Sequence, residues 1–134
     1  LIAMTSRLSS GFQGGSFLLE LRQICLNFPE TEERLNHGMP AFAVKNRSAF
    51  VFVQESKKRN SASIWFKALR EVQEELIEQD PDRFFAPPYL GPAGWVGLRL
   101  DIDLDWSEVA QALEEAWRLV APRRAIKELD GTTP

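Results

Sequence analysis

The chain has 134 residues, a formal net charge of −3 and a pI of about 5.2. This length fits one domain, and the hydrophobic fraction of 44% and charged fraction of 26% are typical of globular proteins. The acidic balance excludes a globally basic surface, so any nucleic-acid contact must come from a local patch. A single cysteine, Cys25, excludes an intramolecular disulfide and CxxC motifs, which favours a reducing cytoplasm. No apolar run approaches the roughly 20 residues of a membrane span, so we expect no membrane partner.

The first predicted element is a helix that starts near Ser16. We expect residues 1–15 to form a flexible N-terminal tail, because glycine and serine are frequent there. Apolar residues then recur at helical spacing, which indicates one buried face: Phe17, Leu18, Leu21, Cys25 and Phe28. Pro29 ends this helix, and we interpret Thr31-Glu32-Glu33 as a turn or helix-start signal in a short acidic connector.

Three antiparallel strands are predicted next. Residues 41–44 and 49–53 are rich in β-branched and aromatic side chains, and residues 45–48 between them contain Asn46, which tolerates the left-handed conformation of a tight turn. After a polar loop over residues 55–60, residues 61–66 alternate as a third strand should. The pattern therefore predicts a hairpin that continues as a meander.

The second half of the chain predicts two more helices and a strand. Residues 68–79 form an amphipathic helix with an acidic outer face, and Pro87 and Pro88 exclude a central strand over residues 84–88. Residues 95–104 indicate a strand with one buried face. Asp105 is placed as the N-cap of the last helix, with Glu108 completing a capping box, and the helix ends at Pro122. Its apolar stripe consists of Trp106, Val109, Leu113, Trp117 and Val120.

This order of elements is typical of an α+β protein. We expect a single compact domain over residues 16–125, in which an antiparallel sheet packs with about three helices. Residues 126–134 are expected to form a flexible C-terminal tail.

Several motifs in this order carry a family resemblance. They are His37-Gly38-Met39-Pro40-Ala41-Phe42, Trp65-Phe66-Lys67, the segment from Asp80 to Val96, Asp105-Trp106, and Leu119-Val120-Ala121-Pro122. The chain thus resembles the MmcQ/YjbR family. The resemblance implies a compact YjbR-like α+β domain and a "double wing" mode of DNA binding, in which hairpin loops are the wings. Family members usually have glycine at the first hairpin turn, where this chain has Lys45-Asn46-Arg47, so its wing is expected to be longer or differently shaped.

DNA is therefore the first candidate partner. The residues expected to contact phosphate are Lys45, Arg47, Lys57, Lys58, Arg59 and Lys67. Should these not bind, the alternative basic surface is Arg123, Arg124 and Lys127. The alternative function is a protein-interaction module that holds a partner chain through its sheet and exposed aromatic residues, which the acidic surface of Glu71 to Glu78 would tolerate. An enzyme or small-ligand protein is the third interpretation.

No catalytic or metal site is predicted. Asp101, Asp103 and Asp105 begin a calcium-loop pattern, but Trp106 stands where that loop needs glycine, and the aspartates fit the exposed face of a strand. His37 is the only histidine, and Cys25, its only thiol partner, lies on an apolar stripe, so a catalytic pair is not expected. No cofactor motif is present. A candidate ligand platform consists of His37, Tyr89 and Trp95, although glycines and aromatics of this kind more often build a tight turn.

Overall fold

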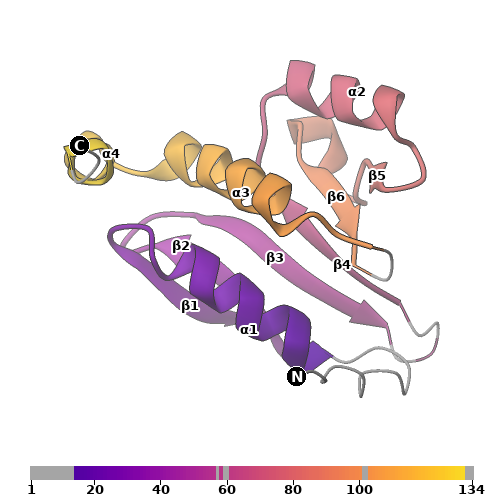
Figure 1. Ribbon diagram of the computed structural model, residues 1–134, viewed down its shortest axis with the longest axis horizontal. Helices are drawn as coiled ribbons and strands as arrows, with labels where there is room; N and C mark the ends of the chain where they lie inside the picture. Colours follow the sequence, from indigo (N-terminus) through magenta and orange to yellow (C-terminus); the bar gives the residue numbers. More distant parts are fainter. Residues whose placement is uncertain (1–13, 57, 59–60, 101–102, 132–134) are drawn as a thin grey trace.

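The computed structural model describes residues 14–56, 58, 61–100 and 103–131, and all structural statements below refer to these residues. The elements in chain order are α1 (Gly14–Cys25), β1 (Thr31–Asn36), β2 (Met39–Val44), β3 (Ala49–Ser56), β4 (Ser61–Phe66), α2 (Arg70–Gln79), β5 (Phe84–Phe85), the 3-10 turn η2 (Gly91–Ala93), β6 (Val96–Arg99), α3 (Trp106–Val120) and α4 (Arg123–Gly131). The strands form one antiparallel six-stranded sheet in the order β1-β2-β3-β4-β6-β5 (Figure 1). The predicted α+β class with an antiparallel sheet is confirmed.

The sheet has one core face and one outer face. Phe42, Val51, Phe66 and Val96 are partners across four neighbouring strands and are all buried, so their common side of the sheet faces the core. The helices α1 and α3 cover this side (Figure 1). The other face remains open along β3 and β4, where Phe52 and Trp65 are only half-buried.

Helix α3 supplies most of the helical side of the core. Asp105 caps it as predicted, because its carboxylate accepts hydrogen bonds from the backbone N–H groups of Ser107 and Glu108. The predicted stripe is buried at Val109, Leu113, Trp117 and Val120. Of the predicted capping box, the bond from the Glu108 N–H to the Asp105 carboxylate is present at 3.4 Å, and the Glu108 carboxylate accepts a hydrogen bond from Arg83 at 2.7 Å.

The segment interpreted as an acidic connector is strand β1, so that interpretation was wrong. Its register on β2 runs from Thr31 opposite Val44 to Asn36 opposite Met39. Charged side chains are common on edge strands such as β1. Both of its glutamates form ion pairs. Glu33 pairs with Arg22 of α1 and Glu32 pairs with Arg34, at 2.8 and 2.7 Å.

A further helix, α4, stands where the sequence predicted the end of the last helix and a tail over residues 126–134. Pro122 ends α3 but also begins α4, because its carbonyl accepts hydrogen bonds from the N–H groups of Ala125 and Ile126. Ala125 is fully buried, and Arg118 of α3 pairs with Asp130 of α4 at 2.6 Å. The helix is therefore packed against the domain.

Strand β6 is shorter than the predicted strand over residues 95–104. It covers Val96–Arg99, and Asp101 and Ile102 lie outside the described residues. Among the described residues, no helix has the length and apolar character of a membrane span.

Candidate nucleic-acid interface and neighbouring pockets

The turn between β2 and β3 holds the first predicted DNA contacts, Lys45 and Arg47. Asn46 adopts the left-handed conformation expected of it, with a φ of 63°. Hydrogen bonds from the residues on either side of Asn46 fix the turn to the rest of the protein. The Lys45 N–H donates to the Glu30 carbonyl at 2.8 Å, and the Arg47 guanidinium donates to the Val120 carbonyl at 3.2 Å. The position of the turn is therefore fixed, and the side chains of Lys45 and Arg47 remain exposed.

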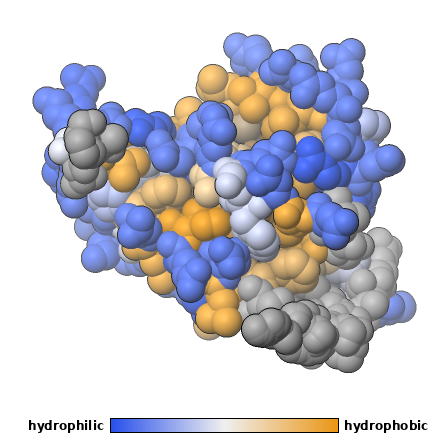
Figure 2. Space-filling view, in the orientation of Figure 1, coloured by the Kyte–Doolittle hydropathy of each residue, from blue (hydrophilic) through white to orange (hydrophobic). Residues whose placement is uncertain are grey.

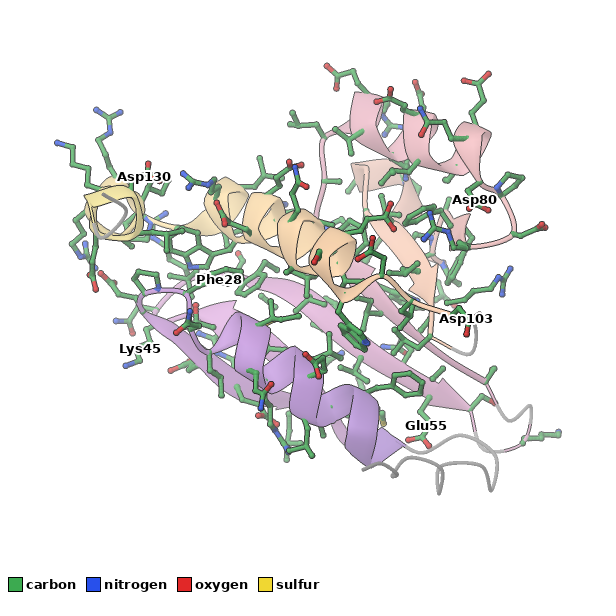
Figure 3. All side chains as sticks on the ribbon, viewed as in Figure 1. Phe28, Lys45, Glu55, Asp80, Asp103 and Asp130 are labelled. Carbon is green, nitrogen blue, oxygen red and sulfur yellow. The ribbon has the colours of Figure 1, made fainter. Side chains whose placement is uncertain are left out.

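Helix α4 brings a second basic group to the same end of the sheet. The Arg124 guanidinium forms a two-pronged ion pair with the Glu30 carboxylate at 2.8 and 2.9 Å, so Glu30 connects α4 to the turn at Lys45. Figure 3 shows Lys45 at the end of the sheet where α4 lies. We call this surface the basic end, and it consists of Lys45, Arg47, Arg123, Arg124 and Lys127. Among the described residues, Lys45, Arg123 and Lys127 are exposed and form no ion pair.

The other predicted wing lies at the opposite end of the sheet. Lys58 follows β3, whereas Lys45 precedes it, and a strand of eight residues spans about 26 Å. In Figure 3, Lys45 and Glu55 lie at opposite ends of the sheet. Lys57 and Arg59 lie outside the described residues. Since turns at the two ends of one strand must point in opposite directions, the sequence already contained the signal that these basic groups do not converge.

Lys67 has a different environment from the other predicted DNA contacts. It follows β4, and its ammonium lies 5.7 Å from the centre of the Trp95 ring, within the range of a cation–π interaction. Its backbone N–H donates to the Phe50 carbonyl at 3.0 Å. This places Lys67 at the β2–β3 turn end of the sheet.

The three residues of the predicted ligand platform are not brought together. His37 is exposed in the β1–β2 turn, where it and Gly38 have φ values of 53° and 82°, as a type I′ hairpin turn requires. Tyr89 is 95% exposed in a loop after β5, at the other edge of the sheet. Trp95 is only 6% exposed and stacks on Phe52, with ring centres 5.3 Å apart.

The remaining residues considered for catalysis or metal binding are Cys25, Asp101, Asp103 and Asp105. Cys25 is fully buried in the core, and its burial raises the pKa of the thiol above its ordinary value. Asp105 caps α3, Asp103 is exposed, and Asp101 lies outside the described residues.

An apolar groove runs between α2 and α3. It has a volume of about 410 Å³, and its walls include Val72, Leu76 and Ala112. Leu69 and Leu119 border it with 55% and 40% of their surface exposed. Figure 2 shows apolar surface among the charged groups on this side of the molecule. The groove could not be predicted from the sequence, because its walls come from two helices about 40 residues apart.

The fold and the basic end define a class: a small α+β domain whose antiparallel sheet carries helices on one face and basic turns at its ends. A family model named YjbR matches residues 26–119. The chain belongs to the YjbR family. The predicted family resemblance is therefore confirmed.

Comparison with solved structures supports the same fold. The chain is similar to the crystal structure of Deinococcus radiodurans protein DR2400, which contains a DUF419 domain, with a TM-score of 0.65 and 18% sequence identity over 76% of each chain. A search of curated proteins found no match.

Proposed function

We propose that this YjbR-family protein binds DNA through the phosphates, using the basic end. The observation that supports the proposal is that α4 and the β2–β3 turn, distant in sequence, place five basic side chains at one end of an acidic protein. We further propose that it acts in the cytoplasm, where its lone cysteine would stay reduced.

The charges of the basic end are suited to phosphate. Arg124 is paired with Glu30 and the Arg47 guanidinium is bonded to the Val120 carbonyl, so these two residues hold the surface together. Lys45, Arg123 and Lys127 are exposed and, among the described residues, without an acidic partner. Exposed cations of this kind neutralise phosphates and release counterions, which supplies most sequence-independent affinity.

Two charge-matched triple variants test the proposal. The first replaces Lys45, Arg123 and Lys127 with glutamine, and the second replaces Lys57, Lys58 and Arg59 in the loop at the opposite end. Each removes two lysines and one arginine, so both change the net charge equally. Binding to two duplexes of unrelated sequence is measured by fluorescence anisotropy at low salt.

The proposal predicts that the first variant loses affinity about equally for both duplexes, because phosphate contacts carry no sequence information. The second variant should lose much less. If the second variant loses more affinity than the first, the phosphate surface lies at the other end of β3.

A second candidate function is the holding of a protein partner, and the groove between α2 and α3 favours it. The groove is lined mainly by apolar side chains, and the outer side of α2 carries Glu71, Glu74, Glu75 and Glu78. These features suit an amphipathic helix with basic residues beside its apolar face. A folded protein that binds no duplex DNA even at low salt, where screening is least, would favour this second function.

A further inference from the structure

Strand β1 forms one edge of the sheet, and among the described residues it pairs only with β2. The Lys45 N–H donates to the Glu30 carbonyl, so Glu30 and Lys45 form a hydrogen-bonded pair just before the strand begins. Hydrogen-bonded and non-hydrogen-bonded pairs alternate along antiparallel strands. Every second residue of β1 therefore turns its backbone N–H and C=O groups to the free edge, namely Thr31, Glu33 and Leu35.

Three exposed leucines lie along this edge. Leu35 of β1 is 78% exposed, and it lies on the same face of the strand as Glu33 because side chains alternate. Glu33 pairs with Arg22, so the side of α1 that carries Arg22 faces β1 (Figure 1). Leu19 and Leu26 lie three residues before and four residues after Arg22, which places them on that side, and they are 60% and 45% exposed. The free edge thus combines open backbone groups with exposed apolar surface.

The charges of β1 are complementary to a second copy of the same strand. In an antiparallel pair centred on Glu33, Glu32 lies opposite Arg34 of the second copy, and Arg34 lies opposite its Glu32. The Arg34 guanidinium is held in position, because it donates to the Glu32 carboxylate and to the carbonyls of Val44 and Arg47. Two of its N–H groups remain for a second carboxylate, so the two copies would form a ring of four alternating charges.

The same register also joins the backbone groups of the free edge. Thr31 lies opposite Leu35 of the second copy, and the two Glu33 residues lie opposite each other, so each pair can exchange N–H···O=C bonds. The two Glu33 carboxylates do not meet as free charges, because each accepts two hydrogen bonds from its own Arg22, at 2.8 and 2.9 Å. The leucines of the two edges approach each other on the α1 side.

We propose that the protein forms a two-fold symmetric dimer through β1, in which two six-stranded sheets join into one. The partner is a second copy because the opposite charges of Glu32 and Arg34 match the same strand in the antiparallel register. Edges that avoid pairing carry lysines, proline or bulges, whereas this edge has an even register and an exposed leucine. The two strands run in opposite directions, so the basic ends of the two copies lie at opposite ends of the joined sheet.

Sedimentation velocity of the full chain at roughly 1 to 500 µM tests the association. Dimerisation through β1 predicts that the mean mass rises with concentration from the 15.2 kDa of one chain towards twice that value. L35E places a charge in the apolar contact of both copies and should weaken dimerisation at least about tenfold. L69E makes the same substitution at a leucine that is 55% exposed beside α2, and it should leave dimerisation unchanged.

A charge exchange tests the register. E32R and R34E each place like charges opposite each other, so each variant alone should dimerise more weakly than the unmodified protein. An equimolar mixture restores opposite charges at both positions, and its heterodimer should form at lower concentration than either homodimer. Thermal melting checks that each variant is folded, and a loss caused by misfolding would not be rescued by mixing.

Amide hydrogen exchange locates the contact on the strand. The N–H groups of Glu33 and Leu35 should exchange more slowly at concentrations where the dimer forms, whereas the N–H of Arg34, which faces β2, should not change. A protein that stays monomeric at roughly 500 µM, a dimer that L35E leaves intact, or a mixture of E32R and R34E that associates no better than either alone would overturn the proposal. None of these measurements involves DNA, so they are independent of the basic end.

Discussion

Replacement of Gln73 by methionine should destabilise the domain through the loop that precedes β6. Gln73 is a buried polar residue, 4% exposed, on α2. Its Nε2 donates to the carbonyl of Gly91 at 2.8 Å and to that of Trp95 at 2.7 Å. Methionine keeps the length and apolar packing of the side chain but removes both donors, so the change isolates the hydrogen bonds.

The expected loss follows from the two carbonyls. The Gly91 carbonyl keeps a hydrogen bond from the Gly94 N–H at 2.9 Å, so it is not left unsatisfied. The main cost therefore falls on the Trp95 carbonyl, and a buried group that loses its partner costs about 1–3 kcal/mol. We expect Q73M to lower the free energy of unfolding by that amount.

Urea denaturation of the unmodified protein, Q73M and Q79M measures this effect. Q79M is the matched control, because Gln79 is exposed on the same helix and its amide donates a long hydrogen bond to the Glu75 carboxylate, at 3.4 Å. The control should change the free energy of unfolding by less than about 0.5 kcal/mol. A loss in Q73M no larger than in the control would refute the reasoning, because the two carbonyls would then be satisfied without Gln73.

Three further predictions concern the core and α4. L113A should cost about 2–5 kcal/mol in urea denaturation, because Leu113 is fully buried, and a cost below about 0.5 kcal/mol would contradict its core position. Cys25 should react with iodoacetamide only after unfolding, because burial raises the pKa of its thiol and hides it; rapid labelling of the native protein would contradict this. Hydrogen bonding by Arg118 lowers the pKa of Asp130, so this carboxylate stabilises the fold above its unfolded pKa and loses that effect as pH falls through its folded pKa. The stability difference between the unmodified protein and D130N should therefore shrink from neutral pH to about pH 3, and a pH-independent difference would argue against the ion pair.

Most of the fold could be predicted where one local pattern determined the structure. Apolar spacing and the Asp105 cap were sufficient for α3, because both signals lie within the helix itself. Strand β1 could not be predicted, because its sequence is largely polar and its stability comes from pairing with β2 and from the Arg22–Glu33 ion pair. Helix α4 was missed because Pro122 is compatible both with the end of one helix and with the start of another.

The candidate site was predictable only in parts. The sequence identified the basic turn at Lys45 and the basic group at Arg124 as alternatives, and it could not show that Glu30 brings them to one surface. The arrangement of the outer face depends on the register of four strands, which places Phe52, Trp65, Gly97 and Phe85 in one row. Register of this kind is set by long-range pairing and is not visible in the spacing of single residues.

The salt dependence of duplex binding tests the central claim most directly. The logarithm of the association constant is plotted against the logarithm of the salt concentration for the unmodified protein and for the variant that lacks Lys45, Arg123 and Lys127. Phosphate binding at the basic end predicts a slope that is shallower in the variant by up to about three units, roughly one for each lost contact. Equal slopes for the two proteins would contradict the claim, because the exposed cations of the basic end would then contact no phosphate.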